Sequence, residues 1–167
     1  MSVWLSPISR GIADHVRSTR TDPIYGYDYD VKVDVAGPDG YGPCRQCLMA
    51  FVEGERRLLF LYNPFGSATG DYAGPVFIHE EPCTPHAHPG VPVEIRGLPL
   101  TLFAYDDGSH FVGEFAPTRD VESALDDLLA DERVAFVHIR NSEARCFVAR
   151  VDAAAKSHSS DSIGLRG

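Results

Sequence analysis

The sequence Pro-Cys-Arg-Gln-Cys-Leu at residues 43–48 and the sequence His-Glu-Glu-Pro-Cys at residues 79–83 bracket the stretch on which the interpretation of this chain depends. Each end carries side chains that bind metals or act as nucleophiles. Between them lie a charged turn at residues 53–55, an apolar run at residues 58–62 and a long loop of small and polar residues. Because neighbouring antiparallel strands can bring two distant segments together, we expect any functional site to lie where the two ends meet.

Four residues of this stretch have the side chains of a tetrahedral metal site. A Cys-x-x-Cys pair in a tight turn lets two thiolates converge on one ion, and a histidine with a third cysteine completes a Cys₃His set. Zinc or non-haem iron is therefore the expected cofactor. The predicted ligands are Cys44, Cys47, His79 and Cys83.

Residues 44–51 also fit an ordinary strand. Side chains on a strand alternate between its two faces, so Cys44 and Cys47 would then point to opposite sides and could not share a metal. One cysteine would be a small core residue and the other a free thiol. A thioredoxin-type redox pair is not favoured, because the turn at residues 53–55 follows too soon for the long helix that such a site requires.

The same residues can be assigned catalytic roles. His79 would be a metal ligand or a general base, and Cys47 or Cys83 a ligand or a nucleophile. Arg45 would anchor an anionic group, because its planar guanidinium holds two oxygens at once. A salt bridge to a nearby glutamate is the alternative role of Arg45. In the proline-rich segment that follows, His86 and His88 are expected to be solvated histidines.

The composition excludes several classes of function. The chain has 167 residues, with 15 Lys and Arg against 24 Asp and Glu, and a formal net charge of −9. A nucleic-acid-binding surface needs clustered Lys and Arg to displace the counterions of the phosphates, and no such cluster occurs. No apolar run has the length of a membrane span, and the first residues lack the pattern of a signal peptide. We therefore expect a cytoplasmic protein that binds neither nucleic acid nor a membrane, with its four cysteines as thiols or ligands.

Strand patterns outnumber helix patterns along the chain. Two amphipathic segments, near residues 8–17 and 120–130, predict helices, and residues 19–29 are expected to form a loop. Since helices and strands do not alternate strictly, the expected class is α+β, with a mostly antiparallel sheet of about seven strands and two helices. The segments whose pattern predicts strands are residues 31–35, 58–62, 75–79, 100–105, 110–115, 134–140 and 146–151, and residues 48–52 are a further candidate.

We expect a single domain over residues 1–152. The composition changes beyond Asp152 to Ala, Ser, His and Gly, which predicts a mobile C-terminal tail over residues 153–167. A domain of this size buries roughly 70% of its unfolded surface, so stability alone does not require a metal.

Four motifs resemble a bacterial family that is catalogued as a domain of unknown function, number twelve hundred and three. They are PCRQCL at residues 43–48, GERRLL at 54–59, YNPF at 62–65, and GPVFIH at 74–79 followed by Cys83. The family has no assigned activity, so the resemblance indicates which residues are important but does not indicate what they do. Residues 84–88 depart from the expected pattern. The family's polar positions correspond to Cys44, Arg45, Cys47, His79 and Cys83, and its aromatic turn to Tyr62, Pro64 and Phe65.

These observations predict a small bacterial enzyme whose pocket contains cysteine, histidine and arginine. Its chemistry would depend on a metal or on a thiol, and its substrate would be a small molecule, with an anionic one favoured by Arg45. The alternative is a non-catalytic module that binds a ligand or partner and uses the cysteine cluster for structure only. A third hypothesis places the site under the tyrosine-rich loop at residues 25–29.

Overall fold

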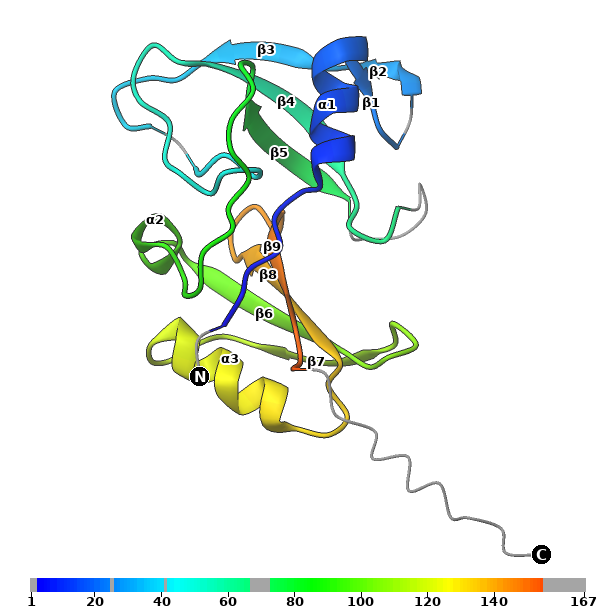
Figure 1. Cartoon of the computed structure of the whole chain (residues 1–167), viewed down its shortest axis with the longest axis vertical. Coiled ribbons are helices and arrows are strands. Elements are labelled where there is room, and N and C mark those ends of the chain that lie inside the picture. Colours follow the sequence, from blue (N-terminus) through cyan, green and yellow to red (C-terminus); the bar gives the residue numbers. More distant parts are fainter. Residues whose placement is uncertain (1–2, 25, 41, 67–72, 155–167) are drawn as a thin grey trace, which may run out of the picture.

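Antiparallel strands make up most of the structure, a computed structural model that describes residues 3–24, 26–40, 42–66 and 73–154. Two larger sheets lie at opposite ends of the molecule, each with a helix beside it (Figure 1). The three-stranded sheet has the order β3-β4-β5, with β3 at Lys32–Val35, β4 at Arg56–Tyr62 and β5 at Gly74–His79. The four-stranded sheet has the order β7-β6-β8-β9, with β6 at Leu100–Tyr105, β7 at Phe111–Phe115, β8 at Phe136–Asn141 and β9 at Phe147–Asp152.

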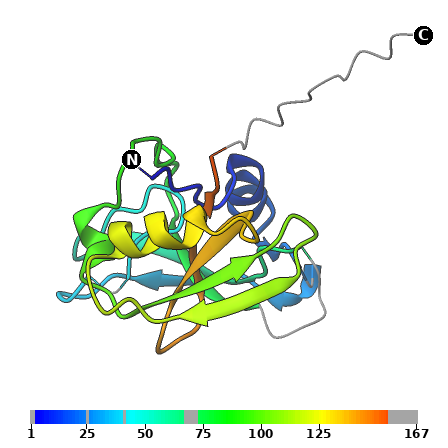
Figure 2. The ribbon, with the colours of Figure 1, turned by 90° about the horizontal axis from the view of Figure 1, so that it is seen from below.

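The four-stranded sheet is built around β6, of which every residue is buried. Its aliphatic face packs against α3 (Val121–Ala130), whose side chains Val121 and Leu125 are buried (Figure 2). The carboxylate of Asp120 accepts a hydrogen bond from the backbone N–H of Ser123 and so caps the first turn of α3. This sheet and α3 enclose the larger of the two main cores.

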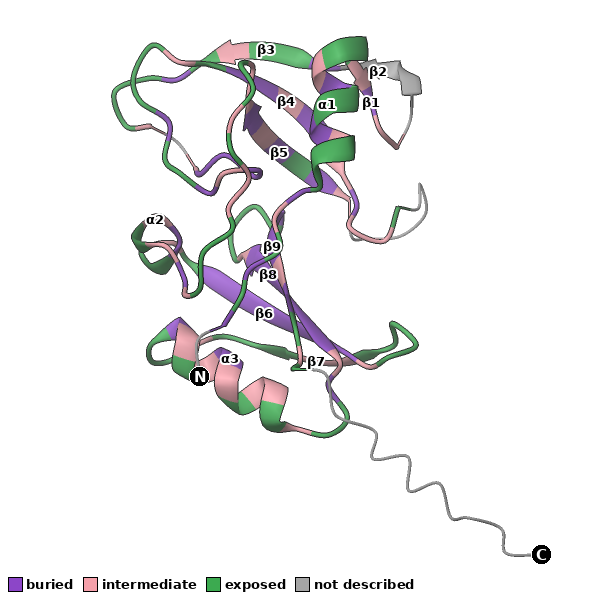
Figure 3. Cartoon of the chain, viewed as in Figure 1, coloured by how far each residue is buried: buried purple, intermediate pink, exposed green. Residues whose placement is uncertain are grey.

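The three-stranded sheet is covered by α1 (Arg10–Thr19), which begins after the cap residue Ser9. Ala13 and Val16 of α1 pack against the buried side chains of β4 and β5. Buried and more exposed residues alternate along β5, as expected for a strand with one face toward a core. The edge strand β3 is largely exposed (Figure 3), so this sheet has a thinner core than the other.

Two irregular segments join the sheets. The N-terminal segment forms isolated bridges from Trp4 to Pro89 and from Ser6 to Arg150 before it enters α1. The segment between β5 and β6 runs from one sheet to the other and contains α2 (Val93–Arg96). The remaining strands, β1 (Thr21–Asp22) and β2 (Gly26–Asp30), form a short antiparallel pair.

The predicted α+β class, the antiparallel pairing and the two amphipathic helices are confirmed. The strands divide among separate sheets, because the proline-rich segment after β5 leaves the sheet edge and starts a new sheet at β6. The prediction of a loop over residues 19–29 is wrong, since β1 and β2 pair there. The helix α2 has four residues, too few for a helical period to be recognised. Residues 155–167 of the expected tail lie outside the described residues.

Candidate metal centre

The segment Cys44–Leu48 is a tight turn, not a strand. The backbone N–H of Leu48 donates to the carbonyl of Cys44 at 2.8 Å, and the N–H of Cys44 donates to the carbonyl of Met49 at 2.9 Å. Leu48 adopts the left-handed conformation, with φ 59°, which reverses the chain. The strand predicted over residues 48–52 is therefore wrong, and only an isolated bridge joins Pro43 to Ala50. With the turn in place, Cys44 and Cys47 can face the same point.

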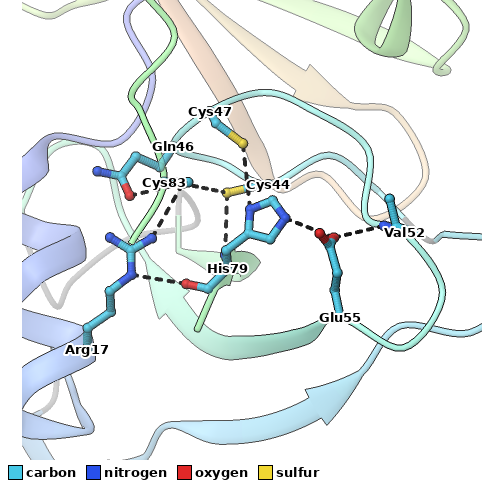
Figure 4. A network of polar contacts seen from close by, with 8 residues as sticks. All are labelled: Arg17, Cys44, Gln46, Cys47, Val52, Glu55, His79 and Cys83. Carbon is cyan, nitrogen blue, oxygen red and sulfur yellow. Dashed lines mark hydrogen bonds and ion pairs between the residues drawn. The ribbon is translucent and has the colours of Figure 1, made fainter. Parts of the chain in front are cut away.

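Both cysteines of the turn face the end of β5 and the residues just beyond it. One ligand atom from each of Cys44, Cys47, His79 and Cys83 lies within 4.8 Å of all the others. The sulfurs of Cys44 and Cys83 are 3.8 Å apart, and the sulfur of Cys47 is 3.6 Å from Nδ1 of His79 (Figure 4). We call these four residues the Cys₃His cluster. The interpretation of Cys44 and Cys47 as residues that face apart is wrong.

These separations fit the edges of a tetrahedral metal site. With metal–sulfur bonds of about 2.3 Å and metal–nitrogen bonds of about 2.0 Å, tetrahedral angles place two sulfurs about 3.8 Å apart and a sulfur and a nitrogen about 3.5 Å apart. The two closest pairs of the cluster already have these spacings. The widest pair, at no more than 4.8 Å, requires a side-chain adjustment on the order of 1 Å. The residues present therefore fit a tetrahedrally bound metal ion.

A carboxylate orients the histidine of the cluster. Nε2 of His79 lies 3.0 Å from a carboxylate oxygen of Glu55, and the same oxygen accepts a hydrogen bond from the backbone N–H of Val52 at 2.8 Å (Figure 4). The hydrogen bond to Nε2 fixes the ring so that Nδ1 faces the sulfurs. A carboxylate on the second ring nitrogen is a frequent partner of metal-binding histidines, because it fixes the tautomer and makes the ligand more basic.

Further donors surround the sulfurs. Arg17 of α1, whose side chain is 9% exposed, donates from Nε to the carbonyl of His79 at 3.0 Å and from a terminal nitrogen to the sulfur of Cys83 at 3.5 Å. The backbone N–H of His79 donates to the sulfur of Cys44 at 3.4 Å. A positive charge and an N–H group beside thiolates stabilise their negative charge. These donors supply a positive charge and an N–H group to the side of the cluster formed by Cys44 and Cys83.

The cluster redistributes protons among its members. Hydrogen bonds from the thiols of Cys47 and Cys83 lower the pKa of Cys44, and the adjoining Cys44 sulfur raises the pKa of Cys47. The sulfurs of Cys44 and Cys83 raise the pKa of His79 to about 10. A metal ion needs thiolates and a neutral imidazole, so its binding displaces these protons and weakens as the pH falls.

Arg45, the predicted anion anchor, lies apart from the cluster. Its guanidinium is buried and donates to the carbonyl of Phe147 at 2.6 Å, to the carbonyl of Pro43 at 2.7 Å and to the sulfur of Cys146 at 3.2 Å. All three nitrogens are engaged, and none faces the cluster ligands. The side chain joins the turn of the cluster to β9, which makes it a link between the two sheets.

Three other polar residues of this stretch, Glu80, His86 and His88, have partners outside the cluster. Glu80, which adjoins His79 in sequence, pairs with Arg56 and Arg20 and not with the histidine. His86 and His88 contact each other, with ring centroids 5.7 Å apart, and are not among the four clustered residues. Tyr25 and the side chains of residues 26–30, the subject of the third hypothesis, lie outside what the structure describes.

Sequence reasoning did not assign Arg17 and Glu55 to the site. Glu55 was recognisable only as part of the charged turn before β4, and Arg17 only as part of the polar face of a helix. Neither has a spacing signal toward the cysteines, because the contacts are made across β4 and β5 and across α1.

No helix in the described parts of the chain has the length and apolar character needed to cross a bilayer.

The chain was compared with known proteins. The model of the family described as "Protein of unknown function (DUF1203)" matches residues 41–153. No match was found among curated proteins or among solved structures. The matched region contains the whole Cys₃His cluster together with Glu55, whereas Arg17 precedes it. Since the match covers more than half of the sequence, the chain belongs to this family of proteins of unknown function.

Proposed function

We propose that this protein binds one zinc ion in the Cys₃His cluster, and that the ion holds the three-stranded sheet in its folded form. The observation that carries the proposal is the convergence of four ligand atoms within 4.8 Å of one another, with sulfur–sulfur and sulfur–nitrogen spacings of 3.8 and 3.6 Å. This is the alternative in which the cysteine cluster has a structural role.

Zinc fits this ligand set better than non-haem iron does. Three thiolates and one imidazole in a tetrahedral arrangement are a frequent zinc site. Non-haem iron oxygenases use two histidines and one carboxylate on one face of the metal and leave positions open. In this cluster the nearest carboxylate, that of Glu55, contacts the distal nitrogen of His79 and so supports a ligand.

A structural role follows from the number and origin of the ligands. Four protein ligands fill a tetrahedral zinc site, whereas catalytic zinc sites keep one position for water or substrate. The ligands come from the turn at residues 44–48, the last residue of β5 and the segment that leaves β5. When bound, zinc supplies a cross-link among these three segments. Cys44 is fully buried and contributes to the core beneath α1 as well.

Elemental analysis of protein purified without a histidine tag tests the proposal. We expect one zinc per chain in the wild type and a loss of zinc in Cys44→Ser and Cys47→Ser. The matched control is Cys146→Ser, because Cys146 is also buried but lies outside the cluster. A wild-type protein that folds fully while it contains little zinc or other metal contradicts the proposal.

An enzymatic function is the second candidate, favoured by the partial exposure of the cluster. Cys47, His79 and Cys83 are only half-buried, so a small molecule can approach them from one side. In this version a cysteine thiolate would react while zinc or Arg17 stabilises it. The two candidates differ in the expected stability of His79→Ala. The structural role requires a marked loss of thermal stability, and the enzymatic role requires near-normal stability together with altered thiol reactivity.

A further inference from the structure

A hollow of about 350 Å³ opens beside the sulfur of Cys83. This volume falls at the lower end of the range for small-molecule sites. Three of its residues, Arg10, Asp14 and Arg17, have the helical spacing that puts them on one face of α1. Its wall includes Arg10, Asp14, Arg17, Gln46, Cys83 and Thr84.

Hydrogen-bond donors in this wall are not all used by the protein. Gln46 is 1% exposed, and its amide oxygen lies 3.5 Å from the sulfur of Cys83. Its amide nitrogen has no hydrogen-bond partner among the residues that the structure describes. Figure 4 shows this nitrogen turned away from the cysteines. This nitrogen is not among the fully buried side-chain atoms that lack a partner, so it keeps some accessible surface, and an acceptor from outside the protein can take its hydrogen bond.

Arg10 is a second unused donor. Its side chain makes no ion pair or hydrogen bond with any residue in the described ranges, although it lines the hollow. Arg17 is committed to the cluster through Nε and one terminal nitrogen, and its other terminal nitrogen is 3.9 Å from the carboxylate of Asp14. The wall thus carries two guanidinium groups against one carboxylate, in a chain of net charge −9.

The two arginines differ in whether they contact the charge of the cluster. Three thiolates and one divalent zinc leave the cluster with one negative charge, and Arg17 is the cation that contacts it. Arg10 makes no such contact and remains available for a ligand. A ligand that fits the hollow must therefore supply acceptor atoms and negative charge, which carboxylate and phosphate groups do.

We infer that the hollow binds a small molecule through a carboxylate or phosphate group, with Arg10 and the amide nitrogen of Gln46 as its donors. The bound group lies next to Cys83 and hence beside the proposed metal. The inference deepens the proposed function and rests on it in one respect, since the metal would hold Gln46 and Cys83 in the wall. The anion anchor expected at Arg45 is thereby assigned to Arg10.

Nuclear magnetic resonance of the zinc-loaded full chain tests the inference, with inorganic phosphate and succinate as probes at constant ionic strength. Each probe is added while the side-chain amide signal of Gln46 is followed. We expect a saturable shift with at least one probe and a Kd on the order of 1 mM. Saturation by phosphate alone or by succinate alone supports the inference and identifies the group that binds. A shift that never saturates with either probe overturns it.

Two variants establish the location of binding. Arg10→Ala should weaken binding by about tenfold, as expected for the loss of one charged hydrogen bond. Arg119→Ala is the control, because Arg119 lines another hollow together with Arg96. Equal Kd values in the wild type and Arg10→Ala would overturn the inference. Zinc content is measured on the same samples. Stoichiometric zinc without anion binding refutes only the inference, and anion binding without zinc refutes only the proposed function.

Discussion

The four-stranded sheet and the three-stranded sheet differ in what stabilises them. In the four-stranded sheet, the fully buried strand β6 and the aliphatic face of α3 form a continuous hydrophobic core. In the three-stranded sheet, β3 exposes Val33 and Val35, and the core beneath α1 includes Cys44 of the metal cluster. Burial of apolar surface is the main source of stability in the first region. In the second region we assign part of that role to the proposed zinc ion.

The proposed zinc ion would have a local role in a chain whose core is sufficient for folding. The whole chain is long enough to fold by hydrophobic burial, so a requirement for zinc is not expected everywhere. The proposed requirement is local, because residues 80–88 after β5 are mostly polar and the turn at residues 44–48 places its one large apolar side chain, Leu48, in the core of the other sheet. A cross-link between them through the proposed ion would fix their positions at the end of the sheet. Variants should therefore affect the two sheets unequally.

The largest effect is expected from removal of a metal ligand. Cys44→Ser should lower the free energy of unfolding by at least about 4 kcal/mol, the linkage contribution of a ligand present at about 1,000 times its Kd. Hydrogen exchange should accelerate in β4 and β5 and change little in β6 and β8. Cys146→Ser is the matched control and should retain the metal. Equal acceleration of exchange in both sheets would contradict the regional difference.

The link between the two sheets should give the next largest effect. Arg45→Met keeps much of the buried volume but removes the donors to the carbonyls of Phe147 and Pro43. We expect a loss of about 3 kcal/mol, since hydrogen bonds from a buried charged group are strong and the carbonyls are left without this partner. Denaturant unfolding measures the loss. Arg133→Met, at an exposed position, is the control. An unchanged stability would show that Arg45 does not couple the sheets.

Acid should destabilise the four-stranded sheet through His138. This residue is 1% exposed, and its Nδ1 has no partner among the described residues. Burial, with the charges of Arg140 and Arg150, lowers the pKa of His138 to about 3. At His138 the unfolded chain binds a proton below about pH 6.5, whereas the folded chain does so only near pH 3. The free energy of unfolding therefore decreases as the pH is lowered below about 6.5, and the loss is about 2.7 kcal/mol at pH 4.5.

The substitution His138→Phe should remove this part of the acid sensitivity. The phenyl ring suits the aromatic surroundings of His138, which include Tyr105 and Phe136. Protonation of the metal ligands affects the wild type and the variant alike, so the difference between their unfolding curves at pH 7 and pH 4.5 isolates His138. The exposed residue His88 gives the control His88→Phe. Identical pH dependence in wild type and His138→Phe would disprove the assignment.

A smaller effect is expected at the carboxylate behind the histidine ligand. Glu55→Gln keeps a side chain of the same shape but removes the negative charge beside Nε2 of His79. The affinity for zinc should fall by about 10- to 100-fold, the usual cost of losing such a partner. Competition with a chromogenic chelator measures the change. The exposed neighbour provides the control variant Glu53→Gln, and equal affinities in the two variants would argue against a role for Glu55.

Much of the fold could be predicted from local patterns. The helical period near residues 120–130 predicted α3, and the patterns at residues 100–105 and 110–115 predicted β6 and β7. The identities of the four cluster residues could also be predicted, because cysteine and histidine have few other roles when they occur in pairs at turn spacing.

The remaining features depend on contacts that a local pattern does not encode. The turn at residues 44–48 uses a left-handed conformation at Leu48, a residue type that seldom adopts it. The contact of Arg17 with Cys83 joins residues that are 66 positions apart. Arg45 lies between two cluster cysteines in sequence, yet its side chain points to β9. In each case the tertiary arrangement decides which of several plausible roles a residue has.

X-ray absorption at the zinc edge, recorded on protein purified without added metal, tests the central claim most directly. The Cys₃His cluster predicts three sulfur neighbours at about 2.3 Å and one nitrogen neighbour at about 2.0 Å from zinc. Cys47→Ser should lose one sulfur neighbour or lose the metal altogether. The absence of bound zinc, or a first shell made mainly of oxygen and nitrogen, would contradict a zinc ion held by Cys44, Cys47, His79 and Cys83.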